Sequence, residues 1–83
     1  MKTKLKMSYA VAVYFGGGPD KAFEALLEKA AKKRASGSGT FLADMIRDVS
    51  FSAASKKEAE ELVKRLRSVK GKRKRVQILE FPD

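Results

Sequence analysis

The stretch SYAVAVYFGGGPDKAFEALL, residues 8–27, passes from a strand pattern through three glycines into a helix pattern. Over residues 5–15, large side chains alternate with small or polar ones, which is typical of a strand that packs one face and leaves the other open. The large side chains are Met7, Tyr9, Val11, Val13 and Phe15, and the others are Lys6, Ser8, Ala10, Ala12 and Tyr14. We therefore expect helices to cover the face that carries the large side chains.

The helix pattern that follows extends over residues 19–34. Pro19 suits the first turn of a helix, and Asp20 favours the positive end of the helix dipole. Apolar side chains recur at helical spacing and form one stripe, made of Ala22, Phe23, Leu26, Leu27, Ala30 and Ala31. The sequence ASGSG, residues 35–39, is expected to end this helix.

A hairpin is predicted over residues 40–53. Its second strand is marked by Val49, Phe51 and Ala53, which alternate with polar residues. A shorter strand is expected over Thr40–Ala43, with a turn near Asp44–Arg47. No Asn-Gly or Asp-Gly pair marks this turn.

The second half of the chain repeats the plan of the first. Ser55 and Glu58 form a capping-box pattern, which predicts the start of a helix. This helix is expected to run to about Val69, before Gly71, with a stripe of Ala59, Leu62, Val63, Leu66 and Val69. The last strand is expected over residues 72–81.

The predicted order is β-α-β-β-α-β in one domain that spans residues 1–83. This order resembles the ferredoxin-like superfold, an α+β two-layer sandwich. The resemblance implies an antiparallel sheet in the order 4-1-3-2, with both helices on one face. If the hairpin does not form, the alternative is a three-stranded βαβαβ sandwich. An order of elements predicts a fold and says little about function.

The composition argues against several chemistries. The 83 residues include no Cys, His or Trp, which excludes a disulfide framework, a thiolate or imidazole metal site, and a Ser-His-Asp triad. We therefore predict no catalytic residue, no metal site, no cofactor and no enzymatic activity. No apolar run reaches the ~20 residues of a membrane span, and the basic start lacks a signal-peptide pattern. A cytoplasmic protein without a membrane partner is expected.

The charge of the chain points to an anionic partner. Nineteen Lys and Arg residues against ten Asp and Glu residues give a net charge of +9. In the predicted topology the triple glycine lies beside the basic run after the second helix, where helix amides and cations together could bind phosphate. The candidate anion-binding residues are Gly16, Gly17, Gly18, Lys64, Arg67, Lys70, Lys72, Arg73, Lys74 and Arg75. The alternatives are a simple flexible turn for the glycines and protection of an edge strand for the basic run.

Two families with this fold share features with the sequence. RDVSFSAASKKEAEELVKRL, residues 47–66, is similar to the third strand and second helix of RNA-recognition domains. Those domains stack bases on aromatic residues of the open sheet face, whereas the open positions here include Asp48, Ser50 and Ser52. We therefore do not expect the sheet face to read bases, although strand one also offers Tyr14 there. Acylphosphatases resemble the fold as well, but the chain has no Asn and no Arg before Arg34, so that activity is not predicted.

Three functions remain open from the sequence. The first is a module that binds the phosphate backbone of RNA or DNA with little sequence preference and a strong salt dependence. The alternative is a small protein-interaction or inhibitory factor, of phage or mobile-element type, that docks on an acidic protein surface. The third is a metabolite-binding regulatory dimer. A homodimer could form through the flat sheet face or an edge strand.

Overall fold

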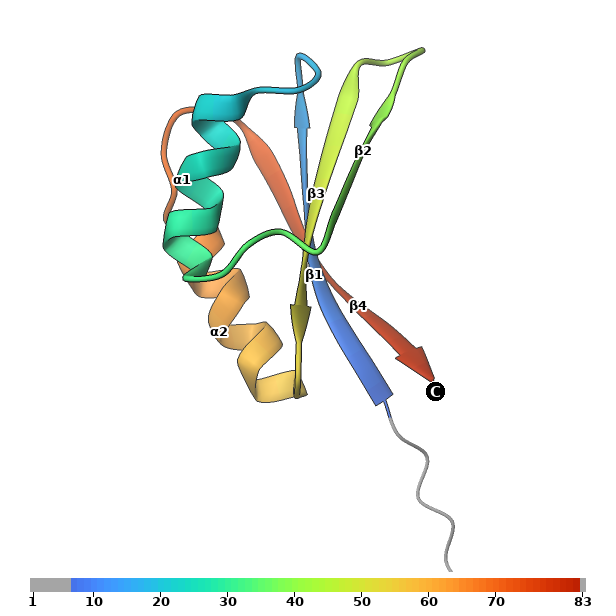
Figure 1. The fold of residues 1–83 in the computed structure, drawn as a ribbon, viewed down its shortest axis with the longest axis vertical. Helices are drawn as coiled ribbons and strands as arrows, with labels where there is room; N and C mark the ends of the chain where they lie inside the picture. The colour runs from blue at the N-terminus through green and yellow to red at the C-terminus, as the bar shows by residue number, and fades with distance from the viewer. Residues whose placement is uncertain (1–6, 83) are drawn as a thin grey trace, which may run out of the picture.

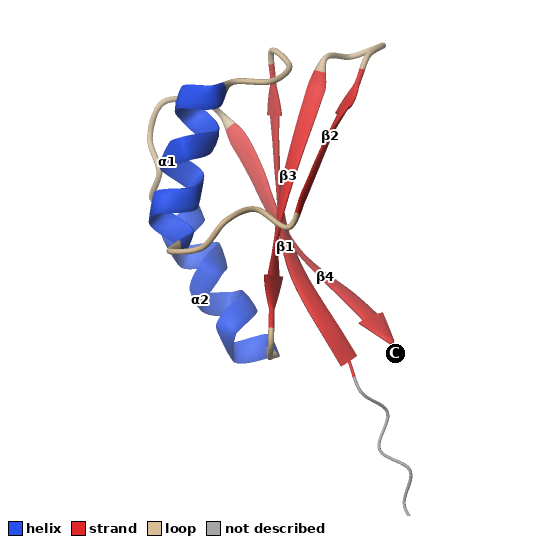
Figure 2. Ribbon diagram, viewed as in Figure 1, coloured by secondary structure: helices blue, strands red, loops and turns tan. Residues whose placement is uncertain are grey.

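The computed structural model describes residues 7–82 and shows a two-layer α+β sandwich (Figure 1). The elements are β1 (Met7–Gly16), α1 (Lys21–Ala31), β2 (Gly37–Phe41), β3 (Ile46–Ala53), α2 (Lys56–Arg67) and β4 (Lys74–Pro82). The strands form one antiparallel sheet in the order β2-β3-β1-β4, and both helices cover the same face (Figure 2). The predicted ferredoxin-like fold is confirmed, and the three-stranded alternative is wrong because the β2–β3 hairpin forms. Residues 5 and 6 of the expected first strand lie outside the described residues.

The core lies between the sheet and the helices, as the alternation in β1 predicts. Val11, Val13 and Phe15 are at most 2% exposed. They pack with β3 and both helices in a cluster that also contains Phe23, Leu27, Ala31, Val49, Phe51, Ala53, Ala59, Leu62 and Leu66. Burying a large apolar side chain stabilises a protein by about 1.5–3 kcal/mol, so this cluster is the main source of stability.

Helix α1 is shorter at both ends than the pattern predicts. Asp20 is the N-cap, because its backbone is extended and its Oδ1 accepts a hydrogen bond from the Phe23 amide at 3.0 Å. Pro19 therefore precedes the helix. At the other end Lys32 adopts the left-handed conformation with φ 60°, and the Lys33 amide donates to the Glu28 carbonyl at 3.3 Å. A residue in the left-handed conformation commonly ends a helix, and that residue is usually glycine.

Strand β2 begins earlier than predicted. The last three residues of the segment ASGSG already belong to β2, since Gly37 pairs with Ser50 of β3. The absence of a side chain at Gly39 matters here, since a Cβ atom would lie 3.0 Å from Asp48 Oδ1. Pairing with β3 thus outweighs the low strand propensity of glycine.

Helix α2 begins at the predicted capping box. The Ser55 hydroxyl accepts from the Glu58 amide at 3.2 Å, and Glu58 Oε1 accepts from the Ala54 amide at 2.9 Å, one residue before the usual donor. The helix ends at Arg67, two residues before the expected end. Neither α1 nor α2 has the length and apolar character needed to cross a membrane.

Candidate nucleic-acid interface

Three loops meet at one end of the molecule, at the top of Figure 1, as the topology predicts. The Gly18 amide donates to the Met45 carbonyl at 2.9 Å, which joins the β1–α1 loop to the hairpin turn. Lys72 Nζ donates to the Gly16 carbonyl at 3.2 Å, which joins the same loop to the α2–β4 connection. The triple glycine and the basic run are therefore neighbours.

The backbone amides at the start of α1 are mostly engaged within the chain. The Gly18 amide binds Met45, and the Asp20 amide donates to Glu24 Oε2 at 2.8 Å. Pro19 has no amide hydrogen. Asp20 also places a carboxylate at the helix N-terminus, where an external anion would bind. Gly17 and Gly18 have φ of +96° and +74°, and Gly18 is buried, so the turn itself explains glycine at these two positions.

Lys72 connects the loops and is not a free cation. Its Nζ lies 3.1 Å from Asp20 Oδ2 and 5.4 Å from the centre of the Phe15 ring. The Phe23 amide and the Lys72 ammonium group together lower the pKa of Asp20 below its usual value. The charge of Lys72 is therefore balanced by the chain's own carboxylate.

Lys74 also has a partner inside the fold. It lies on the helix-covered face of β4, and its Nζ donates to the backbone carbonyls of Arg67 and Val69. These carbonyls belong to the C-terminal end of α2 and the loop after it, where a cation interacts favourably with the helix dipole. Two members of the basic run thus stabilise the connection between α2 and β4.

Arg73 and Arg75 lie at the edge of the open sheet face and are exposed. Within residues 7–82, no carboxylate lies within 4.0 Å of either guanidinium group. They border a surface depression of about 610 Å³, whose other lining residues are Tyr14, Phe15, Gly16, Ile46, Lys74 and Gln77. Lys70, in the preceding loop, is exposed as well. Among the described residues, Lys70, Arg73 and Arg75 thus keep unpaired positive charge at this edge of the sheet.

Lys64 and Arg67 occupy a different surface. They line a groove of about 420 Å³ between α2 and β4, on the helix side of the sheet. Glu60 and Glu61 line the same groove, together with Lys57, Val63 and Ile78. The ten residues predicted from sequence therefore do not form one continuous site.

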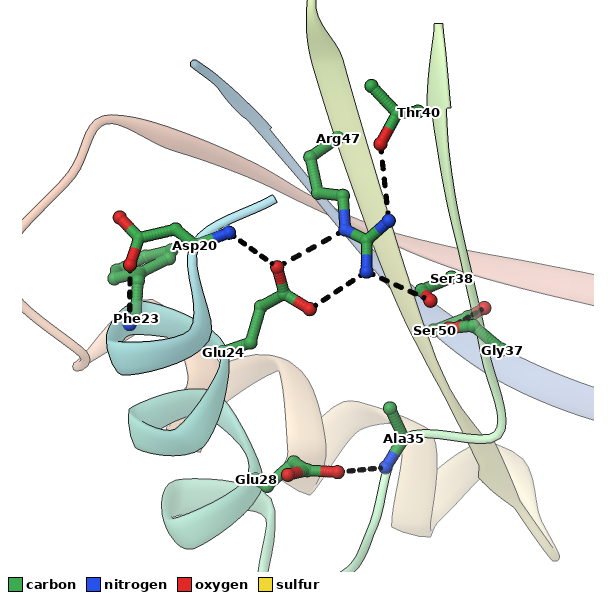
Figure 3. Close-up of polar contacts among 10 residues, drawn as sticks. All are labelled: Asp20, Phe23, Glu24, Glu28, Ala35, Gly37, Ser38, Thr40, Arg47 and Ser50. Carbon is green, nitrogen blue, oxygen red and sulfur yellow. Dashed lines mark hydrogen bonds and ion pairs between the residues drawn. The ribbon is translucent and has the colours of Figure 1, made fainter. Parts of the chain in front are cut away.

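Several carboxylates are used to hold the fold together, which leaves cations unpaired elsewhere. Glu24 forms an ion pair with Arg47 (Figure 3), and Glu58 pairs with Lys33 at 2.6 Å. The Lys33 ammonium group, followed by the Ala54 amide, lowers the pKa of Glu58. Glu28 accepts a hydrogen bond from the Ala35 amide at 2.8 Å. Since the net charge is +9, the surface potential is dominated by the remaining lysines and arginines.

The candidate residues predicted from the sequence do not include Tyr14 and Ile46, which form the apolar part of the depression. Alternation places Tyr14 on the open face, but its neighbours depend on the strand register. In the structure Tyr14 pairs with Asp48 on one side and Arg75 on the other. Among residues 7–82, no group of three or more His, Cys, Asp or Glu side chains could hold a metal ion. Comparison with protein-family models, curated proteins and solved structures finds no match for this chain.

Proposed function

We propose that this protein binds the phosphate backbone of nucleic acid through Arg73 and Arg75, with Lys70 nearby. The observation that supports the proposal is the pair of exposed guanidinium groups that have no carboxylate partner among residues 7–82, beside a depression in an open sheet face. A guanidinium fork matches the geometry of a phosphate and can donate two parallel hydrogen bonds. Contacts of this kind carry no base information, so sequence preference is expected to be weak.

Only some of the ten residues predicted from the sequence are proposed to contact the ligand directly. Lys72 and Lys74 serve the fold. The triple glycine contributes little, because Met45 engages the Gly18 amide, Pro19 has no amide hydrogen, and Asp20 places a carboxylate at the start of α1. Lys64 and Arg67 lie on the other side of the sheet and contribute general electrostatic attraction. We propose binding and not catalysis, which agrees with a chain that contains no His and no Cys. A nucleic-acid ligand also favours the cytoplasm as the location.

The test is a titration of fluorescently labelled single-stranded and duplex oligonucleotides, read by anisotropy at 50 and 200 mM salt. The double variant Arg73→Gln/Arg75→Gln is expected to bind about tenfold more weakly at 50 mM salt, and the slope of log K against log salt is expected to fall by about two. Lys72 and Lys74 are left unchanged so that the loops stay in place. Thermal unfolding of each variant checks that the fold is intact.

The matched control is Lys29→Gln/Arg34→Gln, which removes the same charge from exposed positions on and after α1. It is expected to weaken binding much less. Equal losses in the two double variants would contradict the assignment to Arg73 and Arg75. If no oligonucleotide binds at 50 mM salt, the proposed function is wrong, and docking on an acidic protein surface becomes the hypothesis to test. The mass of the protein–oligonucleotide complex, measured by analytical ultracentrifugation, tests whether the protein binds as a homodimer.

A further inference from the structure

We propose that Tyr14 is a stacking position for a base of single-stranded nucleic acid, with the adjoining phosphates held by Arg73 and Arg75. This inference rests on the proposed function and names the class of ligand more narrowly. It also reverses the expectation that the open sheet face does not contact bases. Asp48, Ser50 and Ser52 are unsuited to base contacts, whereas Tyr14 is an aromatic residue that lies beside Arg75 in a depression.

The neighbours of Tyr14 along its own strand are small on the open face. Along β1 the adjacent positions on this face are Ala12 and Gly16. Ala12 is only 2% exposed, and its side chain is a single methyl group. Gly16 has no side chain, and a Cβ atom placed there would have no neighbour within 4 Å. The tyrosine ring is therefore not enclosed by taller side chains from its own strand, and Tyr14 as a whole is partly exposed.

The depression beside Tyr14 combines an apolar wall with a basic rim. Tyr14 and Ile46 supply the apolar surface, while Arg73 and Arg75 supply positive charge. Its volume of about 610 Å³ falls in the range of small-molecule sites, which is large enough for one nucleotide. Aromatic side chains that border a positively charged groove are the usual means of binding single strands. A duplex keeps its bases stacked inside and cannot place one on Tyr14.

Asp48 is expected to determine on which side of Tyr14 the phosphate backbone of the bound strand lies. Its Cα pairs with Tyr14 on the β3 side, whereas Arg75 pairs with Tyr14 on the β4 side. A carboxylate repels phosphate, so the backbone of the ligand is expected to follow β4. The base then lies over Tyr14 and points toward β3. The charged groups on either side of the ring thus give the ligand one orientation.

The test compares Tyr14→Leu and Tyr14→Phe in the same titration, using a thymidine 12-mer and a duplex of equal length. Tyr14→Leu is expected to weaken binding of the single strand by about fivefold or more, because it removes the ring. Its affinity for the duplex and its salt slope should not change. Tyr14→Phe keeps the ring and is expected to bind the single strand like the unaltered protein.

Phe81→Leu is the matched control, because Phe81 is a 50% exposed aromatic residue on the same face of β4. It lies six residues beyond Arg75, about 20 Å along the strand, outside the depression. A direct signal is also available, since the chain has two tyrosines and no tryptophan. In a Tyr9→Phe background, the fluorescence of Tyr14 is expected to be quenched when the thymidine 12-mer is added.

The outcomes separate this inference from the proposed function. If Tyr14→Leu binds the single strand as tightly as the unaltered protein, while Arg73→Gln/Arg75→Gln binds weakly, stacking is wrong and phosphate binding stands. The same conclusion follows if Tyr14 fluorescence does not respond to saturating oligonucleotide. If neither nucleic acid binds the unaltered protein at 50 mM salt, both proposals fail together.

Discussion

Arg47 and Glu24 form a two-point ion pair that joins β3 to the first turn of α1 (Figure 3). Arg47 Nε donates to Glu24 Oε2 at 3.2 Å, and Arg47 Nη2 donates to Glu24 Oε1 at 3.1 Å. The same guanidinium group donates to the hydroxyls of Thr40 and Ser38 in β2, at 3.1 Å each. One side chain therefore connects two strands and a helix. These contacts hold the β2–β3 hairpin against the start of α1, next to the candidate interface.

Replacement of Arg47 by Met is expected to lower the free energy of unfolding by about 1–3 kcal/mol, because it leaves a largely buried carboxylate without its partner. The Arg47 and Glu24 side chains are 17% and 19% exposed. Urea unfolding at pH 7 measures the change. Lys33→Met is the control, since its ion pair is more exposed, and it should cost less. A loss from Arg47→Met no larger than that control would contradict a role for this pair in joining the layers.

Stability is expected to fall in acid, beginning near the ordinary glutamate pKa of 4.5. Burial raises the pKa of Glu24, but the Arg47 guanidinium and the Asp20 amide lower it by more, so the net pKa is depressed. The pKa values of Asp20 and Glu58 are depressed as well. A depressed pKa in the folded state adds stability above the unfolded pKa, and this stability is lost as pH falls.

The measurement is the urea midpoint at pH 7, 5 and 3. Stability should be similar at pH 7 and 5 and lower at pH 3. Glu24→Gln is expected to be less stable at pH 7 and to show a smaller decrease on acidification. A midpoint that stays constant from pH 7 to 3 would show that these carboxylates do not stabilise the fold.

Gly18→Ala is expected to destabilise the protein by about 1–2 kcal/mol. The φ of +74° disfavours any residue with a Cβ atom, and that atom would lie 2.8 Å from Met45 Cε. Gly16→Ala is the control, because its φ is not positive and the added atom meets nothing within 4 Å. Thermal unfolding should separate the two variants clearly. Equal melting temperatures would mean that the turn does not require glycine at position 18.

Lys32→Gly is expected to raise stability by about 0.5–1 kcal/mol, because glycine adopts the left-handed conformation at the end of α1 without strain. Lys32 has φ 60° in the structure. Lys32→Ala removes the charge but keeps the strain, so it should not stabilise the protein. If the alanine variant gains as much as the glycine variant, the benefit comes from the charge and not from the backbone.

Most of the fold could be predicted because its signals are local. The alternation in β1 gave the buried face, and the capping box at Ser55 marked the start of α2. The errors occurred where a contact distant in sequence overrides a local preference. Strand β2 includes Gly37 because β3 supplies a pairing partner, and α1 ends at Lys32 although no glycine stands there.

The candidate site was less predictable, because charge alone does not show which cations are free. Lys72 and Arg73 are adjacent in the sequence and chemically similar. Lys72 binds Asp20, whereas Arg73 has no carboxylate within 4.0 Å among the described residues. The distinction depends on the neighbours that the loops bring together. The proximity of Tyr14 to Arg75 likewise depends on tertiary structure, because the register between β1 and β4 places the two residues opposite each other.

The amino-acid sequence alone determined the order of the elements, the buried faces, the excess of positive charge and the absence of histidine and cysteine. These properties follow from composition and from periodicities of two and 3.6 residues, which act over a few positions. Only the tertiary structure decided which basic residues are neutralised, which amides are already engaged and which aromatic ring lies beside the arginines. Those outcomes depend on contacts between residues as far apart as Asp20 and Lys72, which form only when the loops meet.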